Sequence, residues 1–183
     1  MDEGTPRLLL EGRPGIGKTT VARRLVALLL EGGVPVDGFT TGELRTGGRR
    51  EGFMVEAVSV AQELLAHLGL PGPPRVGRYG VDLAAFERVA LPTLRAPGPG
   101  RVVVVDELGK MELASAAVRA AVVELLGRDV AVVATVQLAR HQLTDALKRR
   151  PDVRVVPVTE ATRDGLPEQL RDWLVGARQE KAQ

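Results

Sequence analysis

The sequence has 183 residues, of which 44% are hydrophobic, and its 25 Lys and Arg residues nearly balance its 23 Asp and Glu residues. A chain of this length and apolar content buries about 70% of its surface on folding, which excludes the intrinsically disordered and miniature classes. Cysteine is absent, which excludes disulfide frameworks, thiol catalysis and thiolate metal sites.

The first part of the chain predicts a strand, a loop, a helix and a hairpin. Residues 7–11 form a short apolar run, a Gly- and Pro-rich turn follows, and residues 19–30 carry helical periodicity. Residues 37–45 and 51–58 flank Thr46-Gly47-Gly48, a glycine-bearing connection that is typical of hairpins. An antiparallel excursion is therefore expected after the first helix.

The middle of the chain predicts two helices separated by a rigid loop. Residues 61–68 predict a short helix and residues 71–74, which contain three prolines, predict the loop. Residues 82–94 predict a second helix with Asp82 in the N-cap position.

The second half predicts a regular alternation of strands and helices. Four consecutive valines after Arg101 are typical of a strand buried on both faces of a parallel sheet. Helices at 114–126, 137–149 and 160–177 then alternate with strands at 130–135 and 153–158. We therefore expect an α/β fold with a doubly wound, mostly parallel sheet and one antiparallel hairpin excursion, in a single domain over residues 1–183.

A phosphate-binding loop follows the first predicted strand. The segment from Gly12 to Thr19, GRPGIGKT, fits the Walker A pattern and lies between a strand and a helix, as that motif requires. Its glycines allow backbone N–H groups to surround an anion, and the helix N-terminus adds positive potential. We expect Lys18 to bridge the β- and γ-phosphates of a nucleotide and the Thr19 hydroxyl to coordinate Mg²⁺.

An acidic pair follows the four-valine strand, as in a Walker B motif. Asp106 is the predicted Mg²⁺ ligand, acting largely through water because Mg²⁺ keeps several waters in its octahedral shell. Glu107 is the predicted catalytic base that orients and partly deprotonates a water in line with the γ-phosphate. This arrangement favours hydrolysis.

Several other side chains have two open interpretations. Thr135 ends a predicted strand and either contacts the phosphates or water or reflects strand propensity alone. Lys110 either approaches the phosphates or pairs with Glu112. Arg163 either touches the nucleotide or lies exposed on a helix. The isolated histidines, His67 and His141, are interpreted as structural or surface residues.

These motifs together resemble the small stand-alone P-loop nucleoside-triphosphatases, the family of the cancer-related nucleoside-triphosphatases. The resemblance spans nearly the whole chain and is carried by GRPGIGKTT, VPVDGF, GGRREGF, RVGRYGVDL, FERVALPTLR, VVVVDELGKMEL and VTEATRD. It implies a RecA-like fold and slow, Mg²⁺-dependent hydrolysis of ATP, GTP, CTP and UTP to diphosphate and phosphate. The nucleotide-site residues that it implies are Gly12, Arg13, Pro14, Gly15, Ile16, Gly17, Lys18, Thr19, Thr20, Val102, Val103, Val104, Val105, Asp106, Glu107, Leu108 and Gly109.

The sequence also contains physical reasons for broad base preference and slow turnover. No NKxD-type string is present that would select guanine. No arginine is evidently committed as an arginine finger, a group that contributes about 10³- to 10⁵-fold in rate. The candidates for that role are Arg13, Arg49, Arg50, Arg78 and Arg163.

Two alternative functions stay open. The same phosphate cradle serves kinases, and the region 38–80 offers a place for an acceptor. The basic hairpin residues Arg45, Arg49 and Arg50 suggest a nucleotide-dependent switch or a nucleic-acid-stimulated ATPase. Basic residues are little clustered and only five aromatic residues are available to stack bases, so nucleic-acid binding is not favoured.

The expected location and oligomeric state follow from what the sequence lacks. No apolar run approaches the roughly 20 residues that span a bilayer, and the start MDEGTPRLLLEG does not fit a secretory signal. We expect a cytoplasmic protein that is not bound to a membrane, with monomer as the default state.

Overall fold

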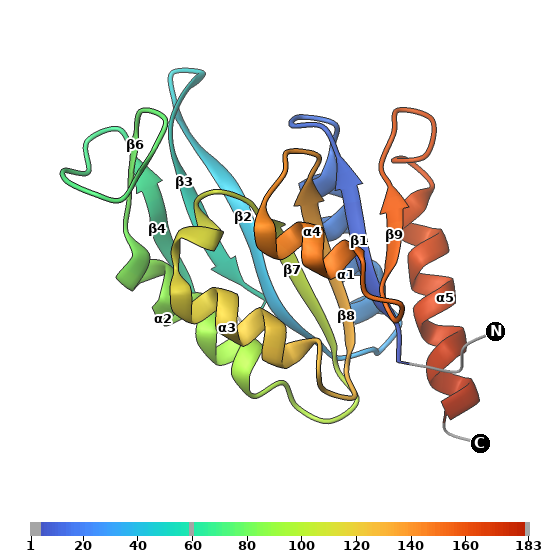
Figure 1. The fold of residues 1–183 in the computed structure, drawn as a ribbon. Helices are drawn as coiled ribbons and strands as arrows, with labels where there is room; N and C mark the ends of the chain where they lie inside the picture. Colours follow the sequence, from blue (N-terminus) through green and yellow to red (C-terminus); the bar gives the residue numbers. More distant parts are fainter. Residues whose placement is uncertain (1–4, 59–60, 182–183) are drawn as a thin grey trace.

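A mixed β-sheet forms the centre of the protein. The computed structural model describes residues 5–58 and 61–181, and the limits of the predicted domain, residues 1 and 183, lie outside that part (Figure 1). The strand order is β5-β6-β4-β3-β2-β7-β8-β1-β9. The strands are β1 (Arg7–Gly12), β2 (Val36–Thr46), β3 (Arg49–Ala57), β4 (Gln62–His67), β5 (Arg75–Val76), β6 (Tyr79–Val81), β7 (Val102–Leu108), β8 (Ala131–Gln137) and β9 (Arg154–Pro157).

The sheet divides into a parallel and an antiparallel part. Strands β2, β7, β8, β1 and β9 pair in parallel. Strand β2 also begins the antiparallel part, which continues through β3, β4, β6 and β5. The predicted α/β fold, with its mostly parallel sheet and its antiparallel hairpin, is confirmed.

Helices cover both faces of the sheet. Helices α1 (Lys18–Glu31) and α5 (Leu166–Lys181) cover one face, while α2 (Leu83–Arg95), α3 (Ala116–Leu125) and α4 (Gln142–Lys148) cover the other (Figure 1). A short 3₁₀ turn, η1 (Glu112–Ala114), follows β7. The four valines of β7 alternate between the two cores: Val102 and Val104 pack under α1 and α5, and Val103 and Val105 pack under α2 and α3. The continuous apolar run is thus explained by burial on both faces.

The strand order brings three carboxyl ends together. Strand β8 lies between β1 and β7, with Leu10 opposite Thr135 and Ala134 opposite Val105. The register of β7 against β8 shifts between Val105 and Leu108. Parallel strands end at the same edge of a sheet, so the loop after β1, the acidic residues of β7 and the last residues of β8 share one edge.

One predicted helix is wrong. Residues 62–67 form strand β4, which pairs with β3 and β6. Leucine, alanine and glutamate favour a helix locally, but Leu65 and Ala66 are fully buried under α2 as part of the sheet. Tertiary pairing therefore overrides local propensity in this segment.

Two predicted helices begin five or six residues later than expected. Helix α4 begins at Gln142, because β8 continues through Gln137 and His141 caps the helix by accepting a hydrogen bond from the Leu143 N–H. Helix α5 begins at Leu166, after turns in which the Thr162 hydroxyl accepts from the Thr159 N–H. In contrast, the predicted N-cap of α2 is confirmed, since Asp82 accepts from the Ala85 N–H at 2.9 Å.

Candidate active site

The loop between β1 and α1 has the backbone that its glycines allow. Gly17 precedes the helix in the left-handed region, with φ of 109°, and no side chain caps the first turn of α1. Gly12 is buried where a Cβ atom would lie 2.8 Å from Ile16. Arg13, Pro14 and Gly15 are exposed around the loop. The uncapped N–H groups of the helix thus remain available to an anion.

Lys18 is buried beneath this loop. Its ammonium is held by the loop itself, since Nζ donates to the carbonyl oxygens of Gly12 at 3.1 Å and Arg13 at 3.2 Å. The side chain is only 6% exposed, and none of the ion pairs among the described residues involves it. A buried ammonium without a carboxylate partner favours the approach of an anion.

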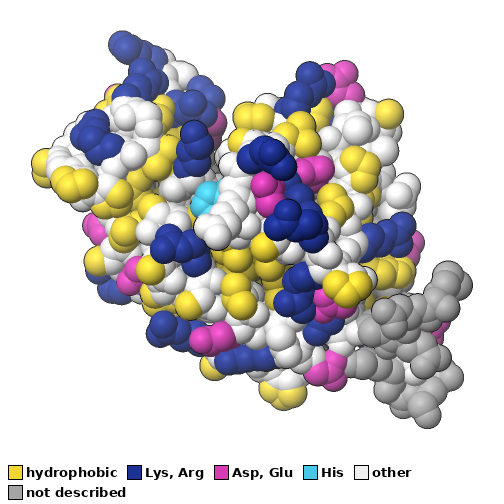
Figure 2. Space-filling view, viewed as in Figure 1, with side chains coloured by type: hydrophobic (Ala, Val, Ile, Leu, Met, Phe, Trp, Pro, Cys, Tyr) yellow, Lys and Arg dark blue, Asp and Glu magenta, His cyan; other side chains and the backbone are white. Residues whose placement is uncertain are grey.

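A pocket of about 480 Å³ opens beside the loop. Figure 2 shows the molecule hollowed between the side of the β2–β3 hairpin and the side of the loop and α5. The phosphate-loop residues, the acidic residue Glu107 and the hairpin all contribute to its wall. The lining residues are Pro14, Gly15, Gly17, Lys18, Thr19, Thr20, Arg23, Thr41, Gly42, Glu43, Arg50, Phe53, Val76, Glu107, Lys110, Met111, Glu112 and Gln137.

Asp106 lies directly behind this wall and is completely buried. One carboxylate oxygen accepts from the Thr135 hydroxyl at 2.7 Å, and the other accepts from the hydroxyl and the N–H of Thr41 at 3.3 and 3.4 Å. Strand propensity alone therefore does not explain Thr135, because its hydroxyl orients the Asp106 carboxylate. Within the described residues, no Lys, Arg or His forms an ion pair with Asp106.

Glu107 reaches the pocket and is held by a residue that sequence reasoning missed. The side-chain amide of Gln137 donates a hydrogen bond to its Oε1. Thr135 and Gln137 are two residues apart on β8, so they lie on the same face and hold the two acidic residues in turn. That spacing was the signal that could have identified Gln137 next to Thr135.

Glu112 is a second buried acid that sequence reasoning did not place in the site. Its Oε2 accepts from the Gly109 N–H at 3.1 Å, and it does not form the proposed ion pair with Lys110, which is exposed at the pocket wall. Burial, with smaller contributions from the negative charges of Glu107 and Asp106, raises the pKa of Glu112 to about 8. Glu112 is therefore protonated at neutral pH in the ligand-free protein.

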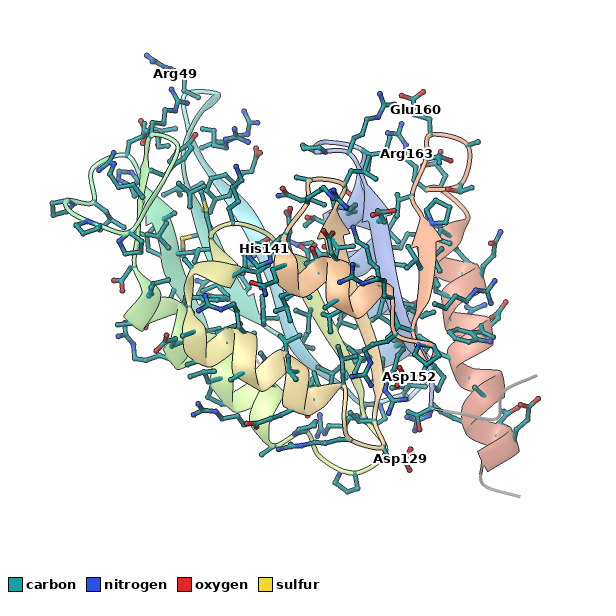
Figure 3. All side chains as sticks on the ribbon, viewed as in Figure 1. Arg49, Asp129, His141, Asp152, Glu160 and Arg163 are labelled. Carbon is teal, nitrogen blue, oxygen red and sulfur yellow. The ribbon has the colours of Figure 1, made fainter. Side chains whose placement is uncertain are left out.

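The remaining predicted residues lie around the pocket rather than in it. The side chains of Val102, Val103, Val104, Val105 and Leu108 are all buried in the two cores. They support the acidic pair from within the sheet. Arg163 lies in the loop before α5 and donates to the Ile16 carbonyl at 3.3 Å, on the outer side of the phosphate loop (Figure 3).

The donors present fit a hard cation such as Mg²⁺. The Thr19 hydroxyl lines the pocket and the Asp106 carboxylate, buried without a cationic partner, lies behind it. Both are oxygen donors of the kind that Mg²⁺ prefers, and water and phosphate oxygens complete such a shell. Nowhere in residues 5–58 and 61–181 do three His, Cys, Asp or Glu side chains gather as a self-contained metal centre.

Across the described part of the chain, no helix has the length and apolar character needed to cross a membrane.

His67, the other isolated histidine, accepts a hydrogen bond from the Gly69 N–H at 2.9 Å and takes no part in the pocket.

Comparison with known proteins identifies relatives over most of the chain. A family model described as NTPase matches residues 7–171. The human cancer-related nucleoside-triphosphatase is 42% identical over 173 residues, which cover 87% of this chain and 91% of that protein. The nucleoside-triphosphatase THEP1 of Thermofilum pendens is 42% identical over 167 residues, which cover 88% of this chain and 91% of that protein.

Solved structures give the same result. The solution structure of a human cancer-related nucleoside triphosphatase has a TM-score of 0.78 at 40% identity and covers 91% of this chain and 95% of its own. The crystal structure of THEP1 from Aquifex aeolicus has a TM-score of 0.81 at 29% identity and covers 92% of this chain and 98% of its own. The expected P-loop fold is thereby confirmed, and the chain belongs to the NTPase family of nucleoside-triphosphatases.

Proposed function

We propose that the protein is a Mg²⁺-dependent nucleoside-triphosphate phosphohydrolase that converts a triphosphate to a diphosphate and phosphate. The observation that carries this proposal is that Lys18, Thr19 and Glu107 line one pocket although Glu107 lies 89 residues after Lys18 in the sequence. The names of the relatives agree with it, since each is a nucleoside-triphosphatase.

Each residue has a defined part in this reaction. The backbone N–H groups from Gly15 to Thr19 and the ammonium of Lys18 bind the phosphate oxygens. Glu107, which the Gln137 amide orients, positions a water molecule to attack the γ-phosphorus and accepts a proton from that water. Thr19 and Asp106 would hold Mg²⁺, which when bound neutralises charge on the β- and γ-phosphate oxygens.

We further propose broad base preference, slow turnover, and action as a single-domain cytoplasmic monomer. The phosphate side of the pocket is built from backbone and a lysine, which contact parts that are common to ATP, GTP, CTP and UTP. The absence of cysteine agrees with a reducing compartment. Comparable phosphate-release rates for the four triphosphates, each below about 1 s⁻¹, are expected.

Two alternatives have different support. A kinase is the second candidate, because the pocket extends past the loop to Phe53 and Val76 and leaves room for an acceptor. The nucleic-acid-stimulated switch has less support, since Arg45 and Arg50 both pair with Glu43 rather than forming a free basic surface. Stimulation of turnover by DNA or RNA at low salt would favour that alternative.

Three variants test the assignment of the residues. Lys18→Ala is expected to weaken nucleotide binding strongly, and Glu107→Gln is expected to lower phosphate release from Mg²⁺-ATP about 10²-fold while ADP still binds. Arg49→Ala, on the exposed hairpin tip, serves as the matched control and should leave both quantities unchanged. Unchanged phosphate release in both Lys18→Ala and Glu107→Gln would show that these residues do not carry the reaction.

A further inference from the structure

The wall of the pocket opposite the phosphate loop is formed by the β2–β3 hairpin. This hairpin begins the antiparallel part of the sheet, which extends beyond the parallel strands. The hairpin residues that line this wall include Glu43 from β2, and Arg50 and Phe53 from β3. Lys18 and Glu107 line the same pocket. A triphosphate in the phosphate loop would therefore have its γ-phosphate between Glu107 and the hairpin.

Arg50 is held in place on this wall by three neighbours. Its Nε donates to the Tyr79 hydroxyl at 3.2 Å, and its Nη1 donates to Glu43 Oε1 at 2.6 Å. Its guanidinium carbon lies 5.2 Å from the centroid of the Phe53 ring, within the range of a cation–π contact. Among the described residues these hydrogen bonds use two of the five N–H donors of the guanidinium. Donors thus remain for an anion in the pocket.

The other arginines near the site are committed elsewhere. Arg23 also lines the pocket, but its Nη2 bridges the Thr41 carbonyl at 3.1 Å and Glu56 at 2.9 Å. Arg163 donates to Ile16 on the far side of the loop, and Arg78 donates to the Tyr79 hydroxyl without lining the pocket. Arg49 projects from the hairpin tip (Figure 3). Arg23 and Arg50 thus both line the pocket and keep free N–H donors. Of the two, within the described residues, only Arg50 is also held in place by aromatic rings, those of Phe53 and Tyr79.

We propose that Arg50 is a catalytic arginine supplied by the chain itself, which donates hydrogen bonds to the oxygens of the transferred phosphoryl group in the transition state. This inference rests on the proposed hydrolysis. In that step the water oxygen forms a bond to the γ-phosphorus and the bond from the γ-phosphorus to the bridging oxygen breaks. The electron pair leaves with the diphosphate, and the water proton passes to Glu107. Arg50 neither forms nor breaks a covalent bond. Its positive charge stabilises the negative charge on the phosphoryl oxygens in the transition state.

Glu43 acts in the opposite sense on the same guanidinium. It forms ion pairs with Arg50 and with Arg45, both at 2.6 Å, and it faces the pocket with its own negative charge. A triphosphate must therefore compete with Glu43 for Arg50. Removing the charge of Glu43 is expected to raise kcat/KM, and this gain should require Arg50.

The first experiment compares a ground-state ligand with a transition-state mimic. For wild type, Arg50→Ala, Arg50→Lys and the control Arg49→Ala, we would measure kcat with Mg²⁺-ATP and the affinities for Mg²⁺-ADP with and without aluminium fluoride. Arg50→Ala should lower kcat about 10²-fold and weaken binding of the aluminium fluoride complex by a similar factor, while ADP affinity stays unchanged. Arg50→Lys should lose most of the rate because it lacks the planar fork. Arg49→Ala should match wild type.

The second experiment is a double-mutant cycle with Glu43. Glu43→Gln should raise kcat/KM several-fold, and the same change in the Arg50→Ala background should have no effect. Millimolar guanidinium should partly restore turnover to Arg50→Ala and leave wild type unchanged.

Two outcomes would overturn the inference. The first is that Arg50→Ala keeps wild-type kcat while Glu107→Gln loses it, which would leave the proposed hydrolysis standing. The second is that Arg50→Ala weakens ADP with and without aluminium fluoride by the same factor, which would give Arg50 a purely structural or ground-state role. If wild type itself released no phosphate, the proposed function would fail before this test applied.

Discussion

Glu112→Gln should change how the stability of the protein depends on pH. Glu112 is buried with a pKa raised to about 8, mainly by burial, against an ordinary value of 4.5. Between these two values the folded protein holds a proton that the unfolded chain releases. The free energy of unfolding contributed by this group therefore falls by about 1.4 kcal/mol for each pH unit in that window.

The variant carries no titratable group at this position and keeps an oxygen that can accept from the Gly109 N–H. From about pH 5 to about pH 7, its stability should therefore gain about 3 kcal/mol relative to wild type, two pH units of the slope given above. Below about pH 4.5 and above about pH 8 the difference should be constant, because both states then carry the same number of protons.

Urea unfolding of the two proteins in EDTA, at intervals from pH 4.5 to pH 9, measures this difference. Every other titratable group is shared, so subtraction isolates Glu112. If the unfolding free energies of the two proteins, plotted against pH, stayed parallel across the whole range, Glu112 would be ionised in the folded protein and its burial would not raise its pKa. Thr144→Val, which changes a buried side chain that carries no titratable group, is the control and should leave the pH dependence of the unfolding free energy parallel to that of wild type.

Three further substitutions test the scaffold of the site. Thr135→Val removes the 2.7 Å hydrogen bond to buried Asp106, so the free energy of unfolding should fall by about 1–3 kcal/mol and the Mg²⁺ concentration for half-maximal activity should rise. Thr144→Val, which removes another buried hydroxyl, should lower the free energy of unfolding alone. Gln137→Ala should lower kcat about tenfold with little change in urea midpoint, since it frees the Glu107 carboxylate; unchanged kcat would contradict the orienting role. Gly38→Ala should lower the free energy of unfolding measured in urea by about 3 kcal/mol or more, because φ at Gly38 is +111° and the added Cβ would lie 1.9 Å from the Val104 carbonyl oxygen. A variant as stable as wild type would refute this close packing.

The parts of the fold that could be predicted from the sequence are those with short-range patterns. The four valines of β7 show burial on both faces, and the Gly-rich string ending in Lys18 carries its own structural context between a strand and a helix. Asp106 and Glu107 lie in β7 directly after its four valines, so their place near the carboxyl end of the strand follows from that run. In each case the neighbours in sequence are also the neighbours that determine the structure.

The parts that could not be predicted depend on contacts between distant residues. Strand β4 is fixed by pairing with β3 and by packing under α2, which its helix-favouring residues do not reveal. Thr41 and Gln137 become partners of the acidic pair only because β2 and β8 lie close to β7. Arg50 is one of many arginines in sequence and is distinguished only by Glu43, Phe53 and Tyr79 around it.

Phosphorus NMR of the purified protein with Mg²⁺-ATP tests the central claim most directly, that the pocket shared by Lys18 and Glu107 transfers the terminal phosphoryl group to water. Without any added acceptor, the account predicts that the ATP signals disappear while ADP and inorganic phosphate appear in equal amounts, and that Glu107→Gln slows this change about 10²-fold. An ATP spectrum that stays unchanged until an acceptor molecule is supplied, and then shows a new phosphorylated product in place of inorganic phosphate, would contradict it.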